Sequence, residues 1–274
     1  MKNIIYQYWK GPLKSGVQLS VKLMKSYAEK IGAEHRFDHN IDIASKIVNV
    51  PIYYEPANPL VDSSFDQYDN VALIDVDVFP IEDLEENIFE AHNIKDVGIC
   101  SEPNQPYYRE IYNVANITSK NDRKWANILK SKWNIDYSYD EKKRPMVYNT
   151  GVMLFSKQGL KKAKDTWPSF QEYVNVIRQA GLPKFYYLYQ DYASAFIHMN
   201  GFEFESMHNG WNSYVHKVGS KPNAKIGDTR TDESKFVHIM FRTADDWSEE
   251  ALWDVTNKPV SEWKIPVSKD FPND

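Results

Sequence analysis

Apolar and polar positions along the chain fall into blocks that predict strands and helices in alternation. The run from Asn3 to Trp9 is apolar and rich in β-branched and aromatic residues, which is typical of a strand. From Val17 to Ile31, apolar residues recur every three or four positions, which predicts a helix with one buried face. A Gly-Pro pair between the two blocks marks a turn. The chain therefore begins with a strand and a helix.

The clearest strand of the chain is predicted at Asn70 to Pro80. After Asn70 its sequence, NVALIDVDVFP, is apolar apart from two acids, as expected of a strand covered on both faces. Further strands are predicted at AEHRFDHN, DVGIC, VYNTGVMLFS and SKFVHIMF, and helices at IEDLEENIFE, at LKKAKDTWPSFQEYVNVIRQAG with an interruption at Pro168, and at YQDYASAFIHMNG. This alternation predicts an α/β fold in which helices cover a central sheet.

Composition narrows the class of protein. A chain of 274 residues that is 42% hydrophobic can bury one sizeable core. Its net charge of -5, without a basic cluster, argues against a nucleic-acid partner. The single cysteine, Cys100, cannot form an internal disulfide and suits a reducing compartment. No apolar run approaches the about 20 residues that span a bilayer. We therefore expect a soluble, cytoplasmic protein without a transmembrane segment.

The chemistry is predicted to lie at Asp75 and Asp77. Residues two apart in a strand point to the same side, so the two acids would present paired carboxylates where the strand leaves the sheet. Such oxygens are ligands for Mg²⁺ or Mn²⁺, which commonly bind substrate phosphates. An Asp-x-Asp pair also arises by chance, and a Lys or Arg partner is the alternative. The position at a strand end favours the metal.

Four segments in this order resemble the GT-A-fold glycosyltransferases, especially the glycogenin-like and lipopolysaccharide galactosyltransferase family. They are YDNVALIDVDVFPIEDLEENIFE, YNTGVMLFS, YQDYASAF and FVHIMF, within residues 68 to 241. The resemblance implies a Rossmann-like α/β fold with a mixed, mainly parallel sheet. It also implies one catalytic domain over 1–274, with a nucleotide-binding half at 1–110, an acceptor-binding half at 111–245 and a C-terminal extension at 246–274.

The resemblance also implies roles for individual residues. Asp75, Asp77 and His238 would hold a metal, and the imidazole favours Mn²⁺ over Mg²⁺, although Mg²⁺ is possible. Further roles fall on Asn149 and Thr150 at the sugar and on Gln190 and Asp191 as catalytic residues. Asp191 would act as general base in an inverting enzyme, or would stabilise an oxocarbenium-like state in a retaining one.

Three interpretations rest on less. Tyr8 could stack on a nucleobase or pack in the core, and Trp211 with Asn212 resembles a loop that would contact the acceptor. The family's Gly-x-x-Lys-Pro-Trp run is replaced by HIMFRTADDW, so Arg242 is the substitute contact for the diphosphate.

The expected function is transfer of a monosaccharide from a nucleoside diphosphate sugar, by default UDP-linked, to a hydroxyl of a glycan or glycoconjugate. A sugar nucleotidyltransferase and a calcium-dependent glycan-binding module are the alternatives. The Gly-rich phosphate loop of the first is missing from NIIYQYWKGPLKSG.

Overall fold

The computed structural model describes residues 1–274 except 42–51, 113–115, 219–224, 242–243 and 264–274. The strands are β1 (Asn3–Trp9), β2 (Glu34–His39), β3 (Asn70–Ile74), β4 (Val78–Pro80), β5 (Val97–Ser101), β6 (Tyr148–Ser156), β7 (Phe204–Ser206), β8 (Ser213–Val218), β9 (Lys225–Asp228) and β10 (Phe236–Met240). The helices are α1 (Ser15–Lys30), α3 (Gln105–Ile111), α4 (Ser119–Trp133), α5 (Lys157–Thr166), α6 (Phe170–Gln179), α7 (Tyr189–Phe196) and α8 (Glu249–Asn257). Short 3-10 turns include η1 (Ile52–Leu60), η4 (Asn209–Asn212) and η5 (Ala244–Asp246).

The strands form two sheets. The larger has the order β2-β1-β3-β6-β5-β7, and the smaller has the order β4-β10-β8-β9. In the larger sheet β2, β1 and β3 are parallel, β5 and β7 are parallel, and β6 runs antiparallel to β3 and β5. The predicted mixed, mainly parallel α/β sheet is therefore confirmed. The strand β6 is buried over eight of its nine residues, as expected of a strand covered on both faces.

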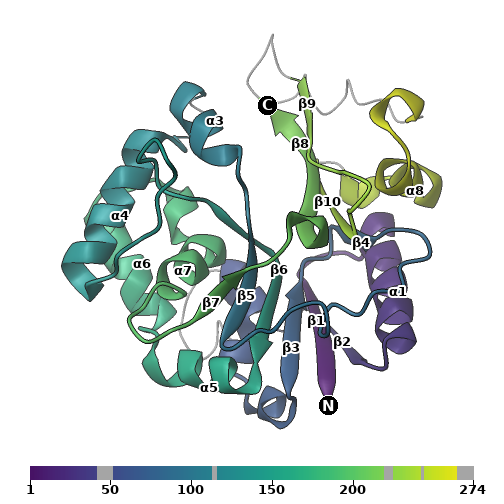
Figure 1. Cartoon of the computed structure of the whole chain (residues 1–274), viewed down its shortest axis with the longest axis horizontal. Helices are drawn as coiled ribbons and strands as arrows, with labels where there is room; N and C mark the ends of the chain where they lie inside the picture. The colour runs from purple at the N-terminus through teal and green to yellow at the C-terminus, as the bar shows by residue number, and fades with distance from the viewer. Residues whose placement is uncertain (42–51, 113–115, 219–224, 242–243, 264–274) are drawn as a thin grey trace.

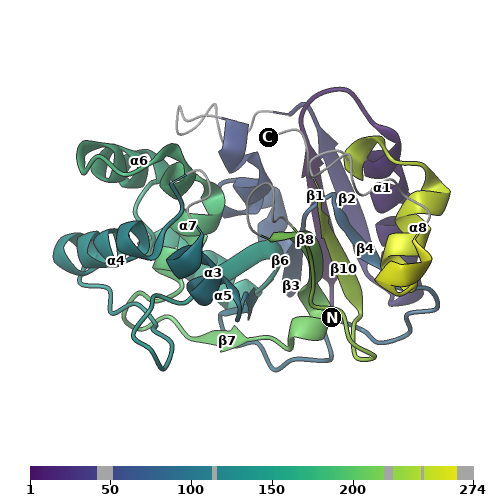
Figure 2. The ribbon, with the colours of Figure 1, turned by 90° about the horizontal axis from the view of Figure 1, so that it is seen from above.

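Helices cover the sheets on both sides. Figures 1 and 2 show α1 and α8 beside the smaller sheet and the first strands, with α4, α6 and α7 at the opposite side. Leu252 and Val255 of α8 pack with Leu19 of α1 and Val237 of β10 in one apolar cluster, so α8 joins the core. None of the helices in the described part of the chain is both long and apolar enough to cross a membrane.

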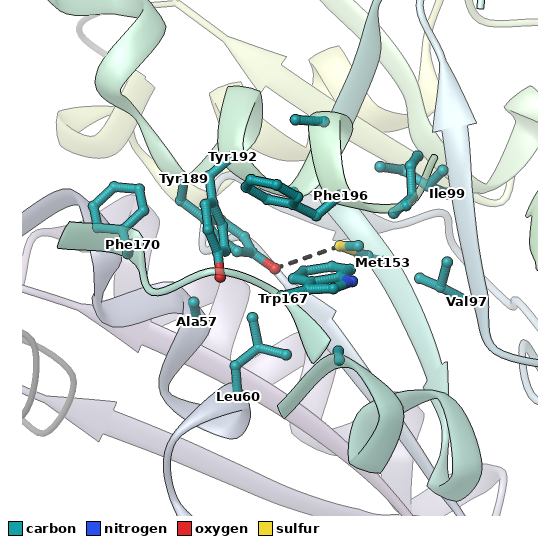
Figure 3. Packing of buried hydrophobic residues seen from close by; sticks show 14 of the residues in the cluster. Ala57, Leu60, Val97, Ile99, Met153, Trp167, Phe170, Tyr189, Tyr192 and Phe196 are labelled. Carbon is teal, nitrogen blue, oxygen red and sulfur yellow. Dashed lines mark hydrogen bonds between the residues drawn. The ribbon is translucent and has the colours of Figure 1, made fainter. Parts of the chain in front are cut away.

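Many of the aromatic side chains pack in the apolar cluster that contains Met153 and Phe155 of β6. In Figure 3 Trp167, Tyr192 and Phe196 pack together, and the Tyr189 hydroxyl donates to the Met153 sulfur at 3.4 Å. The rings of Trp167 and Tyr192 meet edge to face with centroids 5.7 Å apart, a favoured geometry. Most of these aromatics therefore stabilise the fold rather than bind a ligand.

Two predicted elements differ from the structure. The strand predicted at Asn70 to Pro80 ends at Ile74, and a turn separates β3 from β4, which belongs to the other sheet. The helix predicted at residues 81–90 is absent, and the segment forms turns. There the Tyr27 hydroxyl donates to the carbonyl of Glu86 and accepts from the amide of Ile88, so α1 satisfies groups that a helix would have paired.

A candidate metal centre at the junction of the two sheets

The two aspartates lie in the turn that carries the chain from one sheet to the other. The amide of Asp75 donates to the Gly151 carbonyl of β6 at 2.9 Å, which continues the pairing of the larger sheet. The carbonyl of Asp77 accepts from the amide of Ile239 in β10 at 2.9 Å, which continues the smaller sheet. The amide of Val78 closes the turn onto the Asp75 carbonyl at 3.2 Å. Asp75 is thus held by one sheet and Asp77 by the other.

The structure brings Asp75, Asp77 and His238 together. One ligand atom from each lies within 4.8 Å of the others. The His238 Nε2 atom is 3.1 Å from a carboxylate oxygen of Asp77. The side chain of Asp77 is 45% exposed, whereas that of His238 is only 5% exposed, so the cluster is open on the aspartate side. Residues 163 positions apart in the sequence therefore form one candidate metal site.

The charges of the three groups show why a cation fits. Burial and the nearby negative charge of Asp77 raise the pKa of Asp75 to about 7, against the opposing effect of His238. Burial by itself would lower the pKa of His238, but the carboxylates of Asp77 and Asp75 outweigh it and raise the pKa to about 9. Two carboxylates and an imidazole match the donors that Mn²⁺ accepts. A divalent cation would relieve the repulsion between the carboxylates.

A buried chain of hydrogen bonds orients the histidine. The Nδ1 of His238 lies 3.1 Å from the side-chain oxygen of Asn212, which can only accept, so Nδ1 carries a proton and Nε2 faces Asp77. The Asn212 amide donates to the Asn149 oxygen at 3.0 Å, and the Asn149 amide donates to Glu102 at 2.7 Å. All three are at most 4% exposed. Such partners of a ligating histidine fix its tautomer and ring position.

A cavity of about 540 Å³ opens beside the two aspartates. Its wall includes Tyr8 at the end of β1, Gly16 in the first turn of α1 and Asp245 in η5. Thr150 and Gln190 also line it. The volume lies within the range of small-molecule and cofactor sites.

Gln190 and Asp191, at the start of α7, line different sets of cavities. Gln190 lines both the large cavity and a small neighbouring one, whereas Asp191 lines only the small one, together with Arg109. Burial raises the pKa of Asp191 to about 8, although the Arg109 charge opposes this. One carboxylate oxygen of Asp191 and the Nε of Arg109 are buried and find no hydrogen-bond partner among the residues that the structure describes. Asp191 is therefore not part of the wall of the large cavity.

Other sequence-predicted residues occupy different positions. Trp211 is 2% exposed and packs edge to face on Phe236 at 5.3 Å, so its ring has no open face for an acceptor sugar. The side chain of Asn212 forms a hydrogen bond with His238, and that of Asn149 forms one with Asn212 in the same buried network. Arg242 lies outside the described residues.

The sequence did not single out Glu102, Gly151 or Gln7, although each belongs to the site or its support. Gln7 was detectable as a polar residue inside the apolar run of β1. Glu102 gave no signal, because it follows the short strand β5, and its partner Asn149 comes from the distant strand β6.

No protein-family model and no curated protein matches the chain. Among solved structures, the apo form of the WbbM bifunctional glycosyltransferase matches at a TM-score of 0.52 and 10% identity, over 99% of this chain and 52% of that chain. The present chain thus spans about half the length of that structure. Mouse xyloside xylosyltransferase 1 matches at 0.47 and 11% identity, over 87% and 97% of the two chains.

The galactosyltransferase LgtC, in complex with donor and acceptor sugar analogs, matches at a TM-score of 0.45 and 13% identity, over 94% and 98%. At such identities the likeness concerns the fold. The GT-A-type fold that the four sequence segments imply is confirmed, and it rests on the match to WbbM together with the observed sheet order.

Proposed function

We propose that this protein is a metal-dependent glycosyltransferase that moves a monosaccharide from a nucleoside diphosphate sugar, by default UDP-linked, to a hydroxyl of a glycan or glycoconjugate. The observation that carries the proposal is the convergence of Asp75, Asp77 and His238 beside a cavity of about 540 Å³. The fold, shared with a solved glycosyltransferase, agrees with it.

In this proposal Asp75, Asp77 and His238 hold Mn²⁺, with Mg²⁺ as the other candidate. When bound, the ion supplies Lewis-acid stabilisation of the diphosphate leaving group. Tyr8 flanks the nucleoside part of the donor, and Arg242 is assigned to the diphosphate.

The sugar is assigned to the side of the cavity lined by Thr150 and Gln190. Because Gln190 lines the cavity and Asp191 does not, we assign Gln190 to the donor sugar. Asp191 follows it in the sequence and lines the same small neighbouring cavity, so we assign Asp191 to the support of Gln190. The buried Asn149 and Asn212 are assigned to the support of His238 rather than to direct binding.

A thermal-shift panel of nucleotides and UDP- and GDP-sugars, with and without Mn²⁺, tests the proposal. A ligand that binds only the folded state stabilises it by about 2.7 kcal/mol at a hundredfold excess over its Kd. We expect UDP with Mn²⁺ to raise Tm by several degrees, and either component alone to raise it less. Slow release of UDP from the matching UDP-sugar, with water as acceptor, then measures turnover.

Asp75→Asn is the decisive variant, because it keeps the side-chain shape while removing the charge. The matched control is Asp66→Asn, an exposed acid that pairs with Lys164 away from the cavity. We expect the first variant to lose the Mn²⁺-dependent shift and the second to keep it. The proposal fails if no nucleotide shifts Tm, if Asp75→Asn retains the shift, or if only Ca²⁺ and free glycans stabilise the protein.

A further inference from the structure

Two buried polar side chains lie within hydrogen-bond distance of the turn that carries Asp75 and Asp77. Gln7 lies in β1 and Ser20 in α1, and both are 0% exposed. Burying polar groups is unfavourable unless they form hydrogen bonds, so their partners indicate why they are there.

The hydrogen bonds of Gln7 and Ser20 converge on the turn. The Gln7 amide donates to the backbone carbonyl of Asp75 at 3.3 Å and to the Ser20 hydroxyl at 3.2 Å. The Ser20 hydroxyl donates to the backbone carbonyl of Val78 at 2.9 Å. The two side chains therefore hold both ends of the four-residue turn from Asp75 to Val78.

A third side chain fixes the direction of the amide. His35 of β2 lies with Nε2 at 3.1 Å from the Gln7 side-chain oxygen. Because that oxygen can only accept, the ring nitrogen donates, and the Gln7 amide group is left to face the turn. Burial lowers the pKa of His35 to about 4, so the ring stays neutral and the arrangement holds at neutral pH.

The same two elements form part of the cavity wall. Tyr8, the residue after Gln7, lines the cavity, and so do Gly16 and Val17, about one helical turn before Ser20. The backbone of the turn is anchored from the opposite side by β6 and β10. Gln7 and Ser20 thus supply the anchors from β1 and α1.

We propose that Gln7 and Ser20 are positioning residues that hold the Asp75–Val78 turn in the geometry required for metal binding. This inference rests on the proposed function, because it assigns a role around the same metal site. Neither residue contacts the metal or the donor in this proposal. Each acts through the backbone of the turn.

The test compares Mn²⁺ affinity with stability. Gln7→Met keeps the length of the side chain and removes its amide, and Ser20→Ala removes the hydroxyl. We expect each to weaken Mn²⁺ binding, measured by isothermal titration, with Gln7→Met losing about tenfold to a hundredfold, as for other supporting partners of metal ligands. Circular dichroism confirms that each variant is folded.

The matched control is Tyr173→Phe. The Tyr173 hydroxyl, on α6, accepts from Trp125 at 2.9 Å and donates to the Tyr186 carbonyl, so its removal also breaks buried hydrogen bonds. We expect this variant to lower Tm and leave the Mn²⁺ Kd unchanged. If Gln7→Met and Ser20→Ala lower Tm but bind Mn²⁺ like the wild type, the positioning role is wrong and the metal site stands. If the wild type does not bind Mn²⁺, both proposals are overturned.

Discussion

The imidazole of His238 lies directly against the α-carbon of Gly151. A Cβ at Gly151 would lie 2.4 Å from Cε1 and 2.5 Å from Nδ1 of His238, closer than real Cβ contacts. It would also lie 2.8 Å from the side-chain oxygen of Asn149. Glycine at this position of β6 is therefore what allows β10 to place its histidine beside Asp75 and Asp77.

The first prediction concerns Gly151→Ala. The added methyl group must displace His238, and the proposed metal site should lose one ligand. We expect Mn²⁺ binding to weaken at least about tenfold. Leu154→Ala, on the same strand and buried at 2% exposure, is the control that destabilises the core without reaching the site. Equal Mn²⁺ affinity in wild type and Gly151→Ala would show that His238 is not a ligand.

A second prediction follows from the bond between His238 and Asn212. Asn212→Leu removes the acceptor that fixes the Nδ1 proton, so the ring can rotate or change tautomer. We expect about a tenfold to hundredfold loss of Mn²⁺ affinity, measured by titration. The control is Ser213→Ala, the next residue, whose hydroxyl bonds Asn209 and Ser234 instead of His238. A similar loss in both variants would indicate general damage to this turn.

The third prediction uses the pH dependence of Asp191. Burial raises the pKa of this carboxyl group in the folded protein to about 8, from an ordinary value of 3.8. The group therefore favours the folded state when protonated, and that contribution is lost as the pH rises through 8. Asp191→Asn removes this titration. Between pH 5 and pH 9 the unfolding free energy of the wild type should therefore fall by at least about 1 kcal/mol more than that of Asp191→Asn.

The same variant separates two roles of Asp191. If Asp191 only supports Gln190, Asp191→Asn should keep transfer activity within about an order of magnitude, whereas Gln190→Ala should lose more. Complete loss of transfer in Asp191→Asn, with the donor Kd unchanged, would instead identify Asp191 as the general base.

Local periodicity was sufficient to predict the main secondary structure. The strand at Asn3 to Trp9 and the helix after it follow from patterns of apolar residues within a few positions, which depend on local sequence alone. The order of Asp75, Asn149, Gln190 and His238 was also visible. It indicated a fold, which the structure confirms, and a set of candidate ligands.

The tertiary structure decided how these residues meet. Asp75 and Asp77 were predicted to lie on one strand, but both lie in the turn between β3 and β4, where hydrogen bonds tie Asp75 to β6 and Asp77 to β10. Likewise, Trp211 was predicted to contact an acceptor, yet its ring is packed against Phe236. Neither outcome could be predicted from local pattern, since each depends on strands distant in the sequence.

The sequence by itself therefore determined which residues could hold a metal, because carboxylate and imidazole chemistry belongs to residue type. Only the tertiary structure decided which of the accompanying residues line the cavity and which are buried away from it. The pairing of β6 with β3 and of β10 with β4 brings Gly151 and His238 to the same turn. Side-chain direction at such a junction is set by the packing of the two sheets.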